Sequence, residues 1–233
     1  MGTGESDPVR ARPLVTIAAE QTMLGRDEGP LIGRDRELAE LAGALTGEMT
    51  VVGVVGEAGV GKSRLIREFN AIATHYAAEV VITRCESHTA EVPLHALSRL
   101  LRAMFGVRGL DGAATRAHIS ERLREVSALQ PGDAEIVFDL LAISDPEGAV
   151  PKLSALTRRH RLVEVMAKFA QAQPSRQVFV VEDLHWVDAA SDDVLVSFAE
   201  SINADDSILI GTFRPEYHGR MREMAPRRPC AIL

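Results

Sequence analysis

Two groups of residues in this sequence have types and spacing suited to phosphate chemistry. The first is GEAGVGKS, Gly56–Ser63, which has glycine, lysine and serine at every fixed position of a phosphate-binding loop. Glycines let backbone N–H groups approach an anion, lysine reaches the β and γ phosphates, and a serine hydroxyl ligates Mg²⁺. The second group is the acidic pair Glu182 and Asp183, which follows the apolar run Val178–Val181. Together the two groups predict binding and chemistry of a nucleoside triphosphate.

The predicted loop lies between an apolar run, Thr50–Val55, and a helical pattern that starts at Lys62. A rigid strand before the loop and a helix N-terminus after it both favour phosphate binding. The alternative is a glycine-rich turn that binds nothing, which the combination of three glycines with lysine and serine in this context disfavours. The predicted nucleotide contacts are Gly56, Glu57, Ala58, Gly59, Val60, Gly61, Lys62, Ser63 and Arg64, and Ser63 is also a predicted Mg²⁺ ligand.

Charged residues directly after buried strands are the catalytic candidates. In an open parallel sheet the carboxyl ends of the strands face the ligand crevice, so Glu182 and Asp183 are expected to serve Mg²⁺ and the attacking water. A second acid can act there as general base. The other interpretation is a pair of solvated turn residues. Arg214 directly follows the run Ser207–Phe213 and is either a sensor of the γ phosphate or a surface arginine before Pro215.

The apolar pattern of the chain predicts an α/β domain in which strands and helices alternate. Its strand-length runs lack the polar alternation of a half-exposed strand, so they are expected in a buried parallel sheet. The predicted strands are Thr50–Val55, Glu79–Cys85, Val178–Val181 and Ser207–Phe213. The predicted helices are Asp35–Leu45 with Asp35 as N-cap, Lys62–Ala78, Pro93–Phe105, Ala113–Ala128, Ala134–Ala142, Lys152–Ala172 and Ala189–Ile202 with Asp188 as N-cap. This pattern is typical of a three-layer P-loop fold.

Helical patterns follow one another without strands between the second and third predicted strands. The stretch of about residues 93–172 is therefore predicted to be a helical insertion, either a lid that excludes water or a platform that packs against other parts of a longer chain. Its basic cluster, residues 158–161, is interpreted as a solvated helix face. Residues 1–29 show no sustained period and are predicted to be a flexible leader, which leaves residues 30–233 as one domain.

The composition excludes several other classes of protein. The net charge of −7 and the pI near 5.5 argue against nonspecific binding to nucleic acid. Cys85 and Cys230 lie far apart, without the spacing of a zinc site or a disulfide framework. No apolar run is long enough to span a membrane and the N-terminus lacks a secretory pattern, so a cytoplasmic protein without membrane contact is expected. Trp186, the only tryptophan, is interpreted as a packing anchor.

The strings IGRDREL, GEAGVGKS, VEDLHWVD and GTFRPE together resemble the AAA-related ATPase module of the STAND class of signalling NTPases. The likeness covers about Pro30–Pro215. It is strongest to the modules found in large ATP-binding LuxR-type transcription regulators and to those found next to class III adenylate cyclase domains. The resemblance implies ATP with Mg²⁺ as the ligand, a sheet order of 1-4-3-2, and adenine near Ile32 and Gly33. It also implies that Glu182 and Asp183 are the Walker B acids, of which Glu182 is assigned to the metal and Asp183 to water.

Modules of this class continue past the sensor strand with a fifth strand beside the first, whereas this chain stops at Leu233 with CAIL as at most a stub of that strand. The resemblance therefore implies a truncated module that works with a protein partner or an output domain elsewhere, and that can form oligomers. Three functions remain open. The first is an ATP-binding, slowly hydrolysing regulatory switch in signalling or transcription. The second is a small-molecule phosphotransferase, and the third is an interaction fragment that no longer binds nucleotide.

Overall fold

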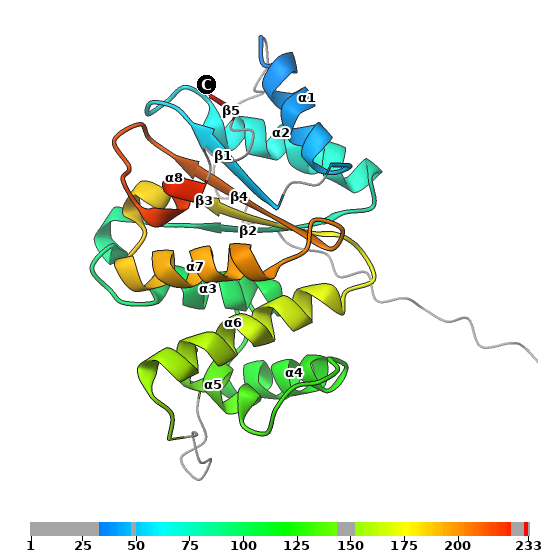
Figure 1. The fold of residues 1–233 in the computed structure, drawn as a ribbon, viewed down its shortest axis with the longest axis vertical. Coiled ribbons are helices and arrows are strands. Elements are labelled where there is room, and N and C mark those ends of the chain that lie inside the picture. Colours follow the sequence, from blue (N-terminus) through cyan, green and yellow to red (C-terminus); the bar gives the residue numbers. More distant parts are fainter. Residues whose placement is uncertain (1–32, 48–49, 144–151, 225–230, 233) are drawn as a thin grey trace, which may run out of the picture. The chain divides into compact units, whose positions relative to one another are not determined.

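The computed structural model describes residues 33–47, 50–143, 152–224 and 231–232. The predicted leader, residues 1–29, lies outside the described residues, and so do Ile32 and Cys230. From Gly33 onward the described residues belong to one compact unit. Within this unit a sheet lies between layers of helices, as Figure 1 shows.

A parallel sheet forms the middle layer, since its central strands are apolar and buried on both faces. Its strands are β1 (Val51–Val55), β2 (Glu79–Arg84), β3 (Gln177–Glu182), β4 (Ser207–Phe213) and β5 (Ala231–Ile232). They lie in the order β2-β3-β4-β1-β5, so the predicted order 1-4-3-2 is confirmed. A short fifth strand, β5, also pairs in parallel with Val54 and Val55 of β1.

Helices cover both faces of the sheet (Figure 1). They are α1 (Asp35–Ala44) and α2 (Lys62–His75) on one face, and α3 (His95–Met104) and α7 (Ala189–Ser201) on the other. On the first face Leu41 and Phe69 are fully buried in a core that includes Val180 of β3. On the second face Phe198 of α7 meets Phe179 of β3 edge-on, with ring centroids 5.2 Å apart. These two cores hold the strand ends in fixed positions.

Three further helices form the insertion between β2 and β3: α4 (Gly112–Arg124), α5 (Asp133–Leu140) and α6 (Ala155–Gln171). Helix α6 packs against α7, and α5 packs against α6, so the insertion adds a layer beyond α3 and α7 (Figure 1). Its apolar residues join the same core as those of α3 and α7. The insertion therefore extends the core on the α3 and α7 face of the sheet. No helix among the described residues is both long and apolar enough to cross a membrane.

The basic cluster on α6 differs from the predicted solvated face. Its three arginines form ion pairs with acids on other helices, namely Arg158–Asp139, Arg159–Asp193 and Arg161–Asp133. The partners lie on α5 and α7, which flank α6, and the Arg161 pair is largely buried. Acids on the neighbouring helices therefore turn these arginines toward the protein, and His160 alone of the four stays mostly exposed.

Helix α6 begins at Ala155, three residues after the predicted Lys152, and two other helix starts differ from the prediction for a local reason. Asp35 is not the N-cap of α1, because Arg34 occupies that position and its guanidinium pairs with Glu37 instead. Helix α3 begins at His95, two residues after Pro93, because Leu94 has a left-handed φ of 61° that the helix cannot include. The elements themselves exist where the sequence predicts them.

Asp188 is the N-cap of α7, as predicted. Its carboxylate accepts hydrogen bonds from the backbone N–H and the hydroxyl of Ser191, at 2.8 and 2.7 Å. It also accepts bonds from the N–H groups of Leu94 and Ala96 at the start of α3, at 2.8 and 3.4 Å. One buried side chain therefore caps the N-termini of two helices that pack on the same face of the sheet.

Candidate nucleotide site

The phosphate loop connects β1 to α2 at the carboxyl edge of the sheet. The N–H of Gly56 donates to the carbonyl oxygen of Phe213 at the end of β4 over 3.2 Å, which anchors the start of the loop. Gly59 and Gly61 have φ angles of 78° and 98°, in the left-handed region that residues with a Cβ rarely adopt. Helix α2 begins directly after Gly61, so its N-terminus lies at the loop.

We expect Gly61→Ala to destabilise the fold and weaken nucleotide binding. No atom lies within 4 Å of the added Cβ, so the cost of about 1–2 kcal/mol comes from the left-handed backbone alone. Gly43→Ala in α1 is the matched control: the space there is equally open and φ is not left-handed, so alanine should stabilise the fold by about 0.5–1 kcal/mol. Urea denaturation measures both effects, and equal stability of the two variants contradicts the expectation.

Lys62 of the loop is buried and bonded to its own loop. Its Nζ donates to the carbonyl oxygens of Gly56 and Glu57 at 2.6 and 2.8 Å. Burial lowers the pKa of Lys62 from its ordinary value, while Asp183 opposes this shift and Arg214 adds to it. A phosphate group would stabilise the buried ammonium better than the two carbonyl oxygens do, because it carries a full negative charge.

The acidic pair lies at the end of β3, where the two side chains have different surroundings. Glu182 is the last residue of the strand and its side chain is 8% exposed, whereas that of Asp183 is 31% exposed. Asp183 has a left-handed φ of 58°, and its N–H donates to the hydroxyl oxygen of Thr212 on β4 over 3.0 Å. This sharp turn separates a buried carboxylate from one that solvent reaches.

Arg84, the last residue of β2, belongs to the site and was not predicted from the sequence. It lies in register with Glu182. Its Nε and Nη2 donate to Oε2 of Glu182 at 3.2 and 2.8 Å, and Nη2 also donates to Oγ of Ser63 at 3.4 Å. Hydrogen bonding to Glu182 raises the pKa of Arg84. The signal that could have found it is a charged residue at the end of a predicted strand, the same pattern that marked Glu182 and Asp183.

The oxygen atoms at this edge of the sheet suit Mg²⁺, which prefers carboxylate, hydroxyl and phosphate oxygens. The predicted ligands Ser63 and Glu182 both bond to Arg84, and Oε1 of Glu182 is buried without a hydrogen-bond partner among the described residues. Over the same residues no three His, Cys, Asp or Glu side chains cluster closely enough to hold a metal alone. Mg²⁺ therefore fits here as an ion shared with the phosphates of a nucleotide.

The start of α1 lies against the loop. Arg34 donates from Nη2 to the carbonyl oxygen of Val60 over 3.5 Å. Gly33, predicted near adenine, directly precedes this arginine and is exposed with a φ of 74°, while its partner Ile32 falls outside the described residues. Of the other predicted contacts, Glu57 and Ala58 are exposed and Arg64 is half-buried.

Arg214 follows β4 at the same edge, and its charge acts on Lys62 and on His185. Both ring nitrogens of His185 are buried without a hydrogen-bond partner in the described part of the chain, and burial lowers the pKa of this imidazole. Trp186 is 38% exposed, so the interpretation as a packing anchor is wrong. The 3₁₀ turn η2 (Leu184–Trp186) buries Leu184 instead.

We expect the thiol of Cys85 to be unreactive in the folded protein. It lies next to Arg84 but is 4% exposed, and burial raises its pKa to about 12. In a Cys230→Ser background, a maleimide reagent at pH 8 should label Cys85 at least about 100-fold more slowly in the native state than in urea. Rapid labelling of the native protein would show that this strand end opens to solvent.

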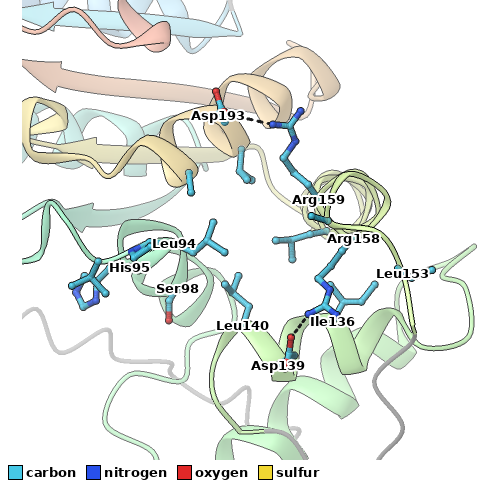
Figure 2. A pocket seen from close by; sticks show the side chains of 16 residues that line it. Leu94, His95, Ser98, Ile136, Asp139, Leu140, Leu153, Arg158, Arg159 and Asp193 are labelled. Carbon is cyan, nitrogen blue, oxygen red and sulfur yellow. Dashed lines mark hydrogen bonds and ion pairs between the residues drawn. The ribbon is translucent and has the colours of Figure 1, made fainter.

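A cavity of about 750 Å³ lies between α3, α5, α6 and α7 (Figure 2). Its wall is largely apolar, with Leu140, Leu153 and Leu162 among the lining residues. The charged groups in Figure 2 are joined in the ion pairs Arg158–Asp139 and Arg159–Asp193. No lining residue comes from the phosphate loop or the acidic pair, so this cavity is separate from the phosphate site.

A comparison with family profiles matches residues 30–210, most of the chain, to a family described as the AAA ATPase domain. The chain belongs to this family. The AAA ATPase domain identified here has its loop and its acidic strand end at one edge of a parallel sheet, and it is a nucleotide-binding P-loop NTPase. Mg²⁺ is the usual companion of the nucleotide in such sites.

Among curated proteins, the AAA ATPase domain is similar to the uncharacterized protein R02095 of Rhizobium meliloti (strain 1021), with 29% identity over 201 residues. The match covers 83% of this chain and 19% of the relative, so the chain spans about a fifth of the relative's length. Two solved structures are also similar. Cdc6p from Pyrobaculum aerophilum matches 90% of this chain and 47% of its own, with 12% identity and a TM-score of 0.48. The Aeropyrum pernix ORC1 protein, solved in complex with DNA, matches 87% and 45%, with 17% identity and a TM-score of 0.43.

Proposed function

We propose that this chain binds ATP with Mg²⁺, hydrolyses it slowly and acts as a regulatory switch in signalling or transcription. One observation carries the proposal. The groups suited to a triphosphate lie at one edge of the sheet, and the two main charged ones are hydrogen-bonded to other groups of the protein. Lys62 is bonded to two loop carbonyls, and Glu182 is bonded to Arg84. Because a nucleotide has to replace both sets of bonds, binding changes the arrangement of the site, which is what a switch requires. The resemblance to the STAND class supports the same role.

Each residue has a role that its position supports. Lys62 exchanges the loop carbonyls for phosphate oxygens, while the left-handed turns at Gly59 and Gly61 leave room for the phosphates. Ser63 and Glu182 would hold Mg²⁺, which neutralises phosphate charge when bound.

Two further groups are assigned to the hydrolytic step. Asp183, the more exposed acid, orients the attacking water and accepts its proton. Arg214, at the end of β4, stabilises charge on the γ phosphate. Water has to reach Asp183 for this step, and its exposed carboxylate supports that access.

The products of ATP labelled in the γ phosphate test the proposal. The full chain is incubated with the label and Mg²⁺, and the products are separated by chromatography. We expect the label in free phosphate, formed slowly. Transfer of the label to an organic acceptor added as a metabolite mixture supports the phosphotransferase instead. Failure to bind Mg·ATP at all supports the interaction fragment.

The switch is proposed to act on a protein partner, another domain or a second copy of the chain, rather than on nucleic acid directly. The net charge of −7 supports this assignment, because a nucleic-acid surface needs an excess of positive charge. Three of the four residues in the basic cluster on α6 are used in internal pairs. A change of sedimentation rate on adding ATP to the chain would support association between copies.

A further inference from the structure

Arg84 stands between the two side chains that would hold Mg²⁺. Its Nη2 lies 2.8 Å from Oε2 of Glu182 and 3.4 Å from Oγ of Ser63. Its Nε lies 3.7 Å from Oδ2 of Asp183. Three oxygens suited to a cation therefore surround one guanidinium group, although their residues come from two separate parts of the sequence, the phosphate loop and the end of β3.

The guanidinium meets the electrostatic need that a metal ion would meet. Glu182 is almost completely buried, and a buried carboxylate without a positive partner is costly. Arginine stays charged at any pH relevant to proteins, so it always supplies this partner. Two of its nitrogens reach the same oxygen, Oε2, and leave Oε1 without a bond. The carboxylate is therefore held by one oxygen only, and the other remains available.

The position of Arg84 also allows its guanidinium to move away from Glu182. Its side chain is 50% exposed, and β2 is the edge strand of the sheet, so solvent lies beside the guanidinium. When a half-exposed arginine moves outward, water replaces the hydrogen bonds that it loses. A fully buried arginine would lose its partners without this compensation. The stem therefore allows two positions, one on Glu182 and one in water.

From this geometry we infer that Arg84 is an internal cation that occupies the metal position of the nucleotide-free site and is exchanged for Mg²⁺ when Mg·ATP binds. The inference rests on the proposed function, since it assumes that ATP and Mg²⁺ bind at this edge. It adds a regulatory property: without Mg²⁺ the guanidinium remains at the site and attracts the phosphates, and with Mg²⁺ it is displaced. Arg84 is thus a positioning residue for the metal ligands and not a phosphate contact in the Mg·ATP complex.

The exchange predicts that a variant of Arg84 changes the affinity for ATP without Mg²⁺ but not with Mg²⁺. In EDTA the guanidinium of Arg84 stays beside the acids and attracts the phosphates, so Arg84→Gln should weaken ATP binding by about tenfold. In excess Mg²⁺ the guanidinium leaves as Mg·ATP binds and does not contact the phosphates, so the same variant should bind ATP within about twofold of the parent chain. The ratio of the dissociation constants in EDTA and in Mg²⁺ should therefore rise by about tenfold in the variant.

Isothermal titration calorimetry with ATP, in EDTA and in excess Mg²⁺, measures both constants on the full chain. Glutamine keeps part of the stem and can still donate to Glu182, so circular dichroism should show a folded variant. Arg84→Lys restores the positive charge and should give a ratio close to that of the parent. Arg158→Gln is the matched control, because Arg158 is also a half-exposed arginine paired with an acid, and its pair with Asp139 joins α6 to α5 within the insertion.

Each other outcome has a definite meaning. If Arg84→Gln weakens ATP binding equally in both conditions, the guanidinium is a lasting phosphate contact or a purely structural group, and the exchange is wrong. If the variant changes neither constant, Arg84 has no part in the cation balance and the exchange is equally wrong. If the parent chain itself does not bind Mg·ATP, the proposed function fails, and the inference fails with it.

Discussion

Replacement of Lys62 by alanine is expected to weaken Mg·ATP binding on the order of 100-fold, the equivalent of roughly 3 kcal/mol for one charge-assisted phosphate contact. Within the described part of the chain the lysine bonds only to two carbonyl oxygens, and its charge is buried. Its removal therefore should not destabilise the empty fold. The measurement is the shift of the thermal midpoint with Mg·ATP, which we expect in the parent chain and not in the variant.

Lys168→Ala is the control for this experiment, since Lys168 lies on α6 and its exposed ammonium donates to the carbonyl oxygen of Ala128. This variant should respond to Mg·ATP as the parent does. An equal thermal response of the parent and Lys62→Ala would show that the triphosphate does not bind at this loop. Loss of the fold in Lys62→Ala, seen by circular dichroism without nucleotide, would show that the lysine is structural.

The second large effect is expected on stability, from Asp188→Ala. The Asp188 carboxylate is 4% exposed and accepts bonds from Leu94, Ala96 and Ser191. Its removal leaves buried N–H groups at the starts of both α3 and α7 without partners, which costs on the order of 3–4 kcal/mol. Urea denaturation followed by circular dichroism measures this loss.

Asp188→Asn separates the charge from the geometry, since an amide keeps one acceptor oxygen at the same place. We expect it to lose about half of what alanine loses. Asp111→Ala compares an ordinary cap, because Asp111 is exposed and accepts a single bond, from Ala114 at the start of α4. It should cost only about 1 kcal/mol. A loss at Asp188 no larger than at Asp111 would contradict the role of a joint cap for two helices.

The sheet was predictable because buried parallel strands are written in the sequence as short continuous apolar runs. β4 has the predicted bounds, Ser207–Phe213, and β1 differs from its prediction by one residue. Helix ends were harder, since they depend on single left-handed residues. Helix α2 stops at His75 rather than Ala78 because Ala77 has a φ of 53°, and no glycine or asparagine marks that turn in the sequence.

The site was predictable as far as local patterns extend. GEAGVGKS carries its chemistry in consecutive residues, and the acids follow their strand directly. Arg84 was missed because its partner Glu182 is 98 residues away and only the register of β2 with β3 brings them together. The ion pairs of α6 were missed for the same reason, since a basic run does not show which acids on other helices face it.

The register of Arg84 with Glu182 also determines how the insertion is attached. The chain leaves the sheet at Arg84, the end of β2, and returns on β3, the neighbouring strand. The two connections of the intervening helices to the sheet therefore belong to two strands that are hydrogen-bonded to each other. Doubling the length of a segment closed in this way costs only about 0.6 kcal/mol in chain entropy. Changes of length in the exposed loops of the insertion should therefore disturb the phosphate-loop edge little, whereas α3 and α6 cannot be removed in the same way, because their apolar residues belong to the core on this face of the sheet.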